Sequence, residues 1–400
     1  MTSLITNIKQ LSLNYLDEII EIRRHLHKNP ELSFHEFQTS KFIAKKLTEM
    51  GIDVVSDISG TAVIGIIQGK TDAGKTIALR ADMDALPIDE INSVSYKSIK
   101  PGVMHACGHD VHMASLLGTA KILKELNQHF NGLVKLIFQP AEELLPGGAI
   151  KLIGAGVLKN PNVDIIIAQH VDPMLEKGFI GMKSGAYMAS NDELYITVEG
   201  TGGHAALIDQ EQNSVFLLSQ AIADIRRAFN NTVQEDTPFV LSIGKIVADG
   251  ATNVVPDIVK AEGTFRTFNE GWRSKALNLM LKIVTSSTNG LGYLEVVKGY
   301  PTLVNDPEIT AECYGLVSEI LGKKHVVTLD KRMTAEDFAW YAQKIPALFY
   351  RLGVGNESKG IKSKLHTSTF NVDENVLCIG MEVMAYATIG MLQNADKLAS

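Results

Sequence analysis

The sequence has few cysteines, no long run of basic residues and no apolar run of membrane-spanning length. Its three cysteines, Cys107, Cys313 and Cys378, form an odd, sparse set that excludes a disulfide framework and favours a reducing, cytoplasmic environment. Cys313 and Cys378 are interpreted as small buried apolar residues. The net charge is −7, and the lack of a basic stretch disfavours nucleic acid as a partner.

Membrane and secretion signals are also missing. No apolar segment approaches the roughly 20 residues of a transmembrane helix. The N-terminal segment has no uninterrupted apolar core and no small-residue cleavage site, so it is expected to form an amphipathic helix rather than a signal peptide. We therefore expect no membrane partner.

The overall composition is that of a globular protein. Hydrophobic residues make up 45% of the chain and charged residues 21%, which excludes a mainly disordered protein. The 400 residues suffice for two domains or for one large domain. No internal repeat, low-complexity tract or coiled-coil heptad occurs in the sequence.

Short apolar runs alternate with longer helical patterns up to about residue 185. The runs are rich in Val, Ile and Leu without strict alternation, as expected for strands covered on both faces of a sheet. A helix is expected to follow Asp110, and together these patterns predict an α/β fold. The predicted strands are Thr61–Gln68, Thr76–Ala81, Leu133–Phe138 and Asp164–Ala168.

The pattern changes near residue 189, which predicts a second, α+β domain. The strands predicted there alternate more clearly, and helices lie between or after them. α/β character then returns, so we predict a large domain of residues 1–188 and 299–400 with an inserted domain of residues 189–298. The elements predicted in the insertion are strands Glu193–Glu199, Phe239–Ile246 and Val259–Thr267 and helices Ser214–Phe229 and Glu270–Thr288. Those predicted after it are a helix near Glu308–Leu321, a strand at Ala347–Arg351 and a last helix after Asp373.

Side chains that bind metals gather at the predicted ends of strands. In an open α/β sheet, ligands bind outside the carboxyl ends of the strands, so residues far apart in sequence can converge there. The thiol of Cys107 and the imidazole of His109 also stand two residues apart, just before the predicted helix. The residues in question are Asp82, Asp84, Cys107, His109, Glu142, Glu143, His170 and, in a later loop, His366.

Cysteine, histidine and carboxylate ligands together suit zinc or another borderline ion, and zinc, manganese, cobalt and nickel all stay open. Two ions that share a bridge hold and polarise a water, and a neighbouring carboxylate such as Glu142 takes its proton. Taken singly, His170 is ordinarily a buried imidazole and the Glu142–Glu143 pair a solvated helix start. The occurrence of all these residue types together, mostly at the ends of strands of one sheet, indicates a metal site. Its candidate ligands are Cys107, His109, Glu143, His170 and His366.

The remaining histidines are not assigned to metal. His105 and His112 are interpreted as neighbours of the ligands or as helix-face residues. The others are interpreted as structural or surface groups: His25, His27, His35, His129 and His325.

Longer motifs run through almost the whole chain: RRHLHKNPELSFHEFQTS, LRADMDALPI, MHACGHDVHMASLLG, FQPAEE, AQHVDP, GTGGHAA, NVVPDIVKAEGTFR, MTAEDFAWYA and LHTSTFNVDE. At these motifs the sequence resembles the M20 family of metal-dependent peptidases and amidohydrolases. The branch that it resembles includes hippurate hydrolases, N-acyl-amino-acid amidohydrolases, N-acetyldiaminopimelate deacetylases and plant auxin-conjugate hydrolases.

The resemblance implies a zinc-peptidase-like α/β catalytic domain with an inserted α+β lid domain, and a binuclear metal centre. It implies that Cys107 bridges the two ions, where other members of the family have an aspartate. His109 and His170 would complete one site, and Glu143 and His366 the other. A bridging thiolate would make the site sensitive to oxidation.

The resemblance also assigns roles to carboxylates near the ions. Glu142 would be the general base that later protonates the leaving amine. Asp82 stands where the family usually has a histidine, so Asp84 is predicted to be the carboxylate that orients His109.

In the lid, the resemblance implies three substrate-binding positions. His204 would polarise the substrate carbonyl and stabilise the oxyanion, and in related enzymes it can come from the other subunit of a lid-mediated dimer. Asn253 and Arg266 would hold a substrate carboxylate. For Arg266 a surface ion pair stays an equal alternative.

We therefore expect a hydrolase that cleaves the amide of an N-acyl amino acid, releasing a carboxylate and a free amino acid. The alternatives are a dipeptidase or carboxypeptidase on the same centre, and a non-catalytic binding protein that keeps the fold. Two departures from the branch stand at residues 207–214 and at Ser368. The acyl group, the native metal and the oligomeric state are not readable from the sequence.

Overall fold

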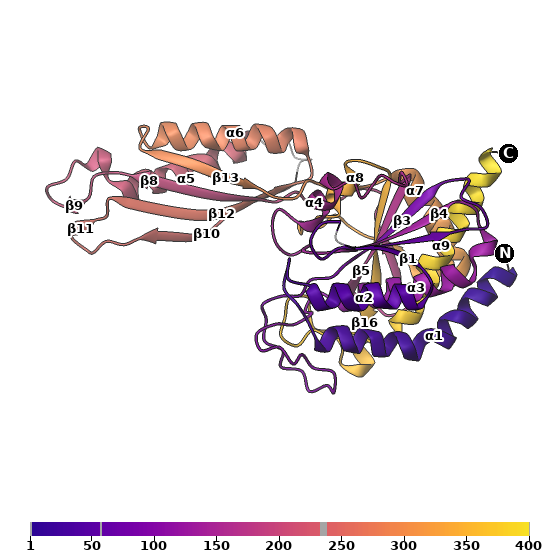
Figure 1. Cartoon of the computed structure of the whole chain (residues 1–400). Coiled ribbons are helices and arrows are strands. Elements are labelled where there is room, and N and C mark those ends of the chain that lie inside the picture. The colour runs from indigo at the N-terminus through magenta and orange to yellow at the C-terminus, as the bar shows by residue number, and fades with distance from the viewer. Residues whose placement is uncertain (1, 57, 233–237, 400) are drawn as a thin grey trace. The chain divides into compact units, whose positions relative to one another are not determined.

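The computed structural model describes residues 2–56, 58–232 and 238–399, and the chain divides into two compact units (Figure 1). The first unit comprises Met1–Gly185, Val304–Asp330 and Asp337–Ser400. The second comprises Ala186–Leu303 and Lys331–Glu336. Each unit has its own sheet and its own hydrophobic core.

The first unit is built on an eight-stranded mixed sheet with the order β1-β2-β4-β3-β5-β16-β6-β15. Its central strands β4, β3, β5 and β16 are parallel. All residues of β3 and β16 are buried, because helices cover both faces of the sheet. The strands are β1 (Asp53–Ser56), β2 (Val63–Gln68), β3 (Thr76–Asp82), β4 (Leu133–Gln139), β5 (Ile165–Glu176), β6 (Ile180–Met182), β15 (Val326–Thr328) and β16 (Ala347–Gly355).

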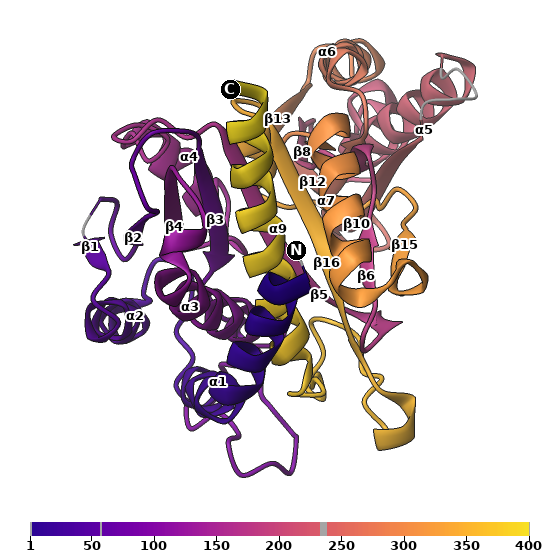
Figure 2. The ribbon, with the colours of Figure 1, turned by 90° about the vertical axis from the view of Figure 1, so that its right-hand side faces the viewer.

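The helices of this unit pack in layers on its sheet. α1, α3 and α9 pack against one another, and α7 packs against α9 (Figure 2). Asp306 fixes the start of α7, since its carboxylate accepts the backbone N–H groups of Glu308 and Ile309 and Pro307 opens the helix. The helices are α1 (Thr2–Lys28), α2 (Phe37–Glu49), α3 (His109–Glu125), α4 (Gly148–Gly154), α7 (Pro307–Leu321), α8 (Ala339–Ala342) and α9 (Val376–Ala399).

Helix α9 is the one candidate membrane span among the described residues. By length and composition its segment Val376–Ala395 would be able to cross a bilayer, contrary to the expectation that no apolar segment approaches that length. However, 89% of its most apolar window is buried inside the first unit. The apolar composition therefore reflects a core helix, which is hydrophobic all round because it is surrounded by protein.

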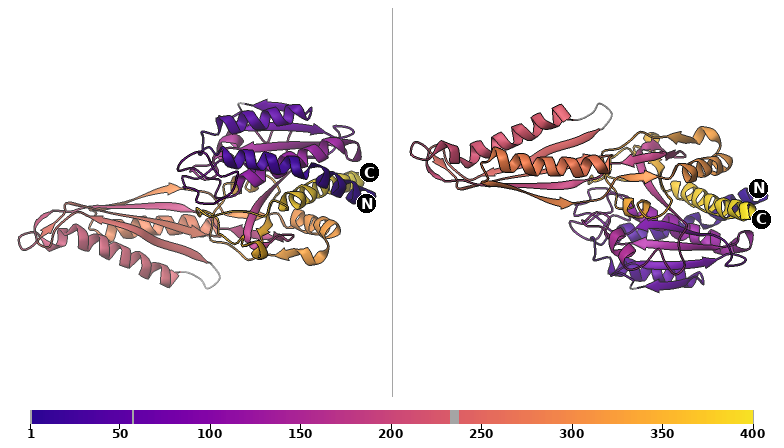
Figure 3. Two further views of the ribbon diagram at one scale, coloured as in Figure 1. Left: turned by 90° about the horizontal axis from the view of Figure 1, so that it is seen from below. Right: turned by 90° about the horizontal axis from the view of Figure 1, so that it is seen from above.

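The second unit is a four-stranded antiparallel sheet, β10-β12-β8-β13, with two helices on one face (Figure 3). A short ladder of β9 and β11 extends from it. Its elements are β8 (Asp192–Glu199), β9 (Gly203–His204), α5 (Ser214–Thr232), β10 (Phe239–Ala248), β11 (Val254–Val255), β12 (Ile258–Thr267), α6 (Glu270–Ser287) and β13 (Gly292–Lys298). Two further short strands, β7 (Gly185–Met188) and β14 (Leu303–Asn305), stand at the ends of this unit.

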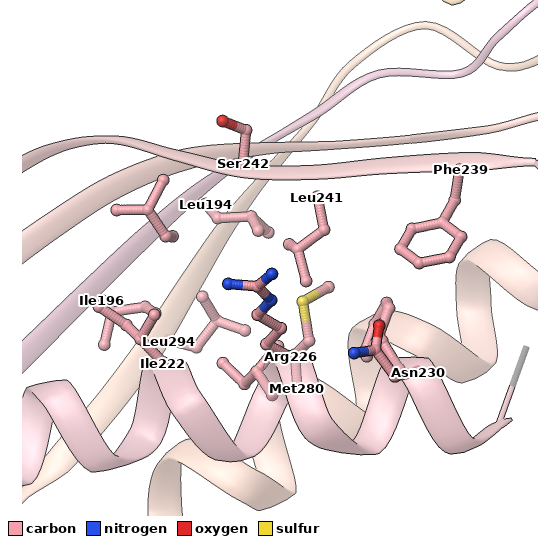
Figure 4. A pocket seen from close by; sticks show the side chains of 13 residues that line it. Leu194, Ile196, Ile222, Arg226, Asn230, Phe239, Leu241, Ser242, Met280 and Leu294 are labelled. Carbon is pink, nitrogen blue, oxygen red and sulfur yellow. The ribbon is translucent and has the colours of Figure 1, made fainter.

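A cavity of about 410 Å³ lies between α5 and the sheet of the second unit (Figure 4). Its walls are mostly apolar side chains such as Leu194, Leu241 and Met280, and Arg226 is the charged side chain at its lining. None of the described lining residues is histidine, cysteine or a carboxylate, so the chemistry expected from the sequence lies elsewhere.

The predicted α/β class is confirmed, and the predicted strands and helices all occur, with ends shifted by a few residues in all but one strand. One strand differs in a way that matters for the site. The strand predicted at Asp164–Ala168 extends to Glu176, so His170 lies within β5 rather than after it. Cys313 is buried as expected, whereas Cys378 is only partly buried.

Candidate metal centre

The candidate site residues of the first unit come from the carboxyl-end half of its parallel strands, from the start of α3 and, for His366, from the loop before α9. Asp82 is the last residue of β3, Glu143 follows β4, and His170 lies in β5. Cys107 and His109 come just before and at the start of α3. This is the edge at which open α/β sheets bind ligands.

Gly108, between these two ligands, has a left-handed backbone with φ of 86°. A Cβ at this position would lie 2.5 Å from Cγ2 of Val171, so only glycine fits here. The tight turn brings Cys107 and His109 next to β5, where His170 lies.

The thiol of Cys107 lies at the centre of the cluster. Its Sγ is 3.5 Å from Nε2 of His170 and 3.4 Å from Nε2 of His366. Oε1 of Glu143 lies 3.2 Å from Nε2 of His366 and 3.9 Å from Nε2 of His109. The five side chains form two groups that share Cys107, one with His109 and His170 and one with Glu143 and His366.

The residues present fit a pair of divalent cations. In each group the potential ligand atoms lie within 4.8 Å of one another. Nε2 of His109 is buried and has no hydrogen-bond partner among the described residues. Because buried polar atoms are ordinarily satisfied, this nitrogen needs a partner of another kind. A set of thiol, imidazole and carboxylate donors suits zinc and similar ions.

The other ring nitrogens of two ligands are held by the backbone. Nδ1–H of His109 donates to the carbonyl oxygen of Asp84 at 2.8 Å, and Nδ1–H of His170 donates to that of Val171 at 2.7 Å. These bonds fix the tautomer in which Nε2 is free to bind a metal. Oδ1 of Asp84 also lies 3.3 Å from Nδ1 of His109, in line with the orienting role expected for Asp84.

The electrostatics of the cluster match a site for cations. Burial lowers the pKa of His109, but the negative charge of Asp82 and the hydrogen bond to Asp84 outweigh burial and raise it to about 10. Burial, reinforced by the charges of Glu143 and Glu142, raises the pKa of the Cys107 thiol well above its usual range. Both groups must lose a proton to bind a metal ion, so metal binding is coupled to proton release.

His112 lies beside the ligands without being free to act as one. Its Nδ1–H donates to Oδ1 of Asp82 at 2.6 Å, and its Nε2 accepts the backbone N–H of Val171 at 2.9 Å. Asp82 also accepts a hydrogen bond from Arg80 at 2.6 Å. Both ring nitrogens of His112 are therefore occupied by hydrogen bonds.

Glu142 is the buried carboxylate next to the cluster. Only 7% of its surface is exposed, and one carboxylate oxygen lies within 4.8 Å of the ligand atoms of His109 and Glu143. Its backbone N–H donates to Oδ1 of Asp84 at 3.0 Å. A carboxylate at this distance can exchange protons with a water held between the ligands and a substrate.

The three remaining candidates, His204, Asn253 and Arg266, belong to the second unit. Of these, His204 and Asn253 lie close together. His204 lies in β9 opposite Val254 of β11, and the N–H of Ala205 donates to the carbonyl of Asn253 at 2.9 Å. Arg266 is near the far end of β12, about 26 Å along an extended strand from Ile258, beside which the β9–β11 ladder begins. Its guanidinium donates a hydrogen bond to the carbonyl oxygen of Met333 at 2.9 Å.

Two side chains that support the site escaped the sequence analysis. Ser33 donates a hydrogen bond of 2.6 Å to Oδ2 of Asp84, and Glu36 accepts the backbone N–H of Ala141 at 2.9 Å. Both residues lie in the N-terminal motif RRHLHKNPELSFHEFQTS, which is one of the motifs that carry the family resemblance but in which no residue was assigned to the site.

The chain matches one protein family over most of its length. The profile described as "Peptidase family M20/M25/M40" matches residues 78–389. Thermostable carboxypeptidase 2 of Saccharolobus solfataricus is 40% identical over 383 residues, which are 94% of this chain and 95% of that protein. The N-acyl-L-amino acid amidohydrolase of Geobacillus stearothermophilus is 41% identical over 285 residues, 71% of this chain and 76% of that protein.

A solved structure supports the same assignment. The YXEP protein of Bacillus subtilis, described as a dinuclear metal binding peptidase from the M20 family, has a TM-score of 0.79 and 33% identity, and the match covers 95% of this chain and 99% of that one. The resemblance drawn from the sequence motifs is thereby confirmed. The protein belongs to the M20/M25/M40 family of peptidases and is a hydrolase that acts on amide bonds.

Proposed function

We propose that this protein hydrolyses N-acyl amino acids at a binuclear metal centre formed by Cys107, His109, Glu143, His170 and His366. The observation that carries the proposal is the pair of ligand groups sharing Cys107, with the carboxylate of Glu142 next to them. The substrate class is supported by relatives that are named for N-acyl amino acid hydrolysis and for N-acetyl-L-cysteine deacetylation.

Zinc, manganese, cobalt or nickel ions, when bound, would supply Lewis-acid polarisation of a water and of the substrate carbonyl. Glu142 takes a proton from that water as its oxygen attacks the carbonyl carbon. Glu142 then delivers the proton to the amide nitrogen as the C–N bond breaks. The products are the carboxylate of the acyl group and the free amino acid.

His204, Asn253 and Arg266 are proposed to bind the substrate. His204 donates to the oxygen that becomes negative as water adds, and donors aimed at a developing charge lower the barrier. Arg266 with its planar fork, together with Asn253, holds the carboxylate of the amino acid.

A homodimer through the second unit is proposed, in which His204 serves the partner's centre. His204 and Arg266 are separated by the length of β12, so one chain cannot place both on the same small substrate. β10 is an edge strand of its sheet, and Ile246 and Val247 on it and Val254 on β11 are exposed apolar residues. Exposed apolar groups along a free edge are typical of a surface that pairs with another chain.

Mixing two inactive variants tests this arrangement. His204→Ala and Arg266→Ala are each expected to lower kcat/KM about 10²-fold or more, since each loses a substrate contact. If subunits exchange freely, half of the dimers are mixed and one centre in each is intact, so activity returns to about 25% of the wild-type value. Activity should be measured before and after mixing. No recovery, with subunit exchange demonstrated by a mass-tagged chain, would show that both residues act within one chain.

The substrate class is tested by amine release from N-acetyl, N-benzoyl and dipeptide substrates. Chelator-treated protein is expected to be inactive, and adding Zn²⁺, Mn²⁺ or Co²⁺ is expected to restore cleavage of N-acyl amino acids. Because a 40% identical relative is named a carboxypeptidase, cleavage of dipeptides alone would instead assign peptidase activity to the centre. Binding of N-acyl amino acids without turnover would contradict the proposal. The proposed bridge also bears on location. A thiolate that bridges two ions is sensitive to oxidation, so we propose that the protein acts in the reducing cytoplasm.

A further inference from the structure

The turn that carries Glu142 and Glu143 has an unfavourable backbone. Ala141, just before these two residues, has φ of 53°, a left-handed conformation that residues with a Cβ seldom adopt. Such a conformation persists only where surrounding contacts impose it, and it is concentrated at functional sites. The contacts that hold Ala141 therefore also decide where Glu142 and Glu143 stand.

Glu36 supplies the contact to Ala141. Its Oε1 accepts the backbone N–H of Ala141 at 2.9 Å and also that of Phe34, a second left-handed residue with φ of 64°, at 2.9 Å. Its Oε2 accepts the hydroxyl of Thr61 at 2.6 Å. The whole residue is buried, with 0% exposure. Burying a carboxylate is costly, and these three hydrogen bonds offset part of that cost while they fix the backbone of two strained residues.

Asp84 is a second buried carboxylate that accepts backbone N–H groups of this turn. The N–H of Glu142 donates to its Oδ1 at 3.0 Å, and the N–H of Glu143 donates to its Oδ2 at 2.9 Å. Three consecutive backbone N–H groups are thus held by two buried carboxylates. On the other side of the turn, the N–H of Gly148 donates to the carbonyl of Ala141 at 2.8 Å.

We propose that Glu36 is a positioning residue, which holds Ala141 in its left-handed conformation and thereby sets Glu142 and Glu143 for proton transfer and metal binding. The inference rests on the proposed roles of Glu142 and Glu143. It gives a purpose to the N-terminal motif, which lies more than 100 residues before the turn in the sequence. Helix α2 begins directly after Glu36, so a purely structural role for this carboxylate is the alternative to exclude.

The test combines Glu36→Ala with Ala141→Gly. Glycine adopts a positive φ without steric cost, so it keeps the turn accessible when the carboxylate is missing. Glu36→Ala is expected to lower kcat about 10–100-fold with KM within about twofold, and Glu36→Ala/Ala141→Gly to recover about tenfold of that loss. Ala141→Gly alone is expected to keep near wild-type kcat. Glu36→Gln retains an acceptor oxygen, so it is expected to stay within about threefold of wild type and provides a folded variant if Glu36→Ala does not fold.

Glu31→Ala is the matched control. The carboxylate of Glu31 lies in the same segment and accepts the backbone N–H groups of Gln38 and Thr39 in the first turn of α2. Its loss should lower the melting temperature while leaving kcat unchanged. An equal loss of kcat in Glu31→Ala, or a loss in Glu36→Ala that Ala141→Gly does not relieve, would assign Glu36 a structural role only.

A second readout does not depend on any substrate. Since Glu143 is held by the same turn, titration of metal-free Glu36→Ala with Co²⁺ is expected to show about tenfold weaker binding of one of two ions, visible in the thiolate-to-metal absorption. Unchanged affinity for both ions would overturn the proposal. If the wild-type protein cleaves no N-acyl amino acid, the proposed function fails, while this titration still decides the role of Glu36.

Discussion

Replacing Glu142 with alanine is expected to lower kcat for an N-acetyl amino acid by about 10³–10⁴-fold while both metal ions stay bound. General acid–base catalysis contributes up to about 10⁴-fold, and here one carboxylate performs both proton transfers. Glu142 is in neither of the two groups that share Cys107, so its removal leaves their ligands in place. Its backbone N–H still bonds to Asp84, because that contact does not involve the side chain.

The neighbouring residue is the control for this experiment. Glu143→Ala removes a ligand from one group, so metal content by elemental analysis should fall and the remaining activity should depend on the concentration of added metal. Adjacent carboxylates would then give opposite results, metal retained in one variant and lost in the other. Near wild-type turnover in Glu142→Ala would remove Glu142 as the base.

The fold class was accessible from the sequence because its main strands are short, apolar and buried on both faces. Segments such as Thr76–Asp82 carry no polar alternation, and the structure places them at the centre of a covered sheet. Helix α2 and the strands β1 and β6 were not among the predicted elements. The two strands are only four and three residues long, too short for a hydrophobic period to appear in the sequence.

The ligand groups were accessible for a related reason. Parallel strands end at one edge, so residues that follow the predicted strands were expected to converge there. The structure places Sγ of Cys107 3.5 Å from Nε2 of His170, although His170 lies within β5 rather than after it. His366 was a candidate because of its residue type, and its loop gives no pattern from which its position in the fold follows. It lies 3.4 Å from Cys107 with φ of 59°, a strained backbone that no sequence pattern reveals.

What the sequence could not predict is the geometry that depends on backbone strain and on the paths of loops. The carboxylate of Glu36 contacts a turn more than 100 residues away, and the two backbone N–H groups bound by its Oε1 belong to the left-handed residues Phe34 and Ala141. The separation of His204 from Arg266 is also a property of strand length and pairing, and it is invisible in two short motifs.

Replacing Cys107 with alanine is expected to reduce metal affinity at both groups by about 10²-fold or more, because the thiol is the one donor that they share. Loss of His170 or His366 would weaken one group only. Metal content after gel filtration, measured by elemental analysis, should therefore fall further in Cys107→Ala than in either histidine variant. Cys313→Ala is the control, since its thiol is buried in the core of the first unit and belongs to neither ligand group.

The variant Cys107→Asp tests whether the bridge requires a thiolate or whether a carboxylate at the same position can replace it. A carboxylate has two oxygens with which to bridge two ions, so this variant should retain metal and part of the activity. It should also resist hydrogen peroxide, which oxidises the wild-type thiolate and releases the metal. Cys378 is the partly buried cysteine and is present in both proteins, so a difference in peroxide sensitivity isolates Cys107.

Unchanged metal content in Cys107→Ala would count against a thiolate bridge. The two groups would then be independent sites, and Glu143 and His366 would have to bind their ion without the cysteine.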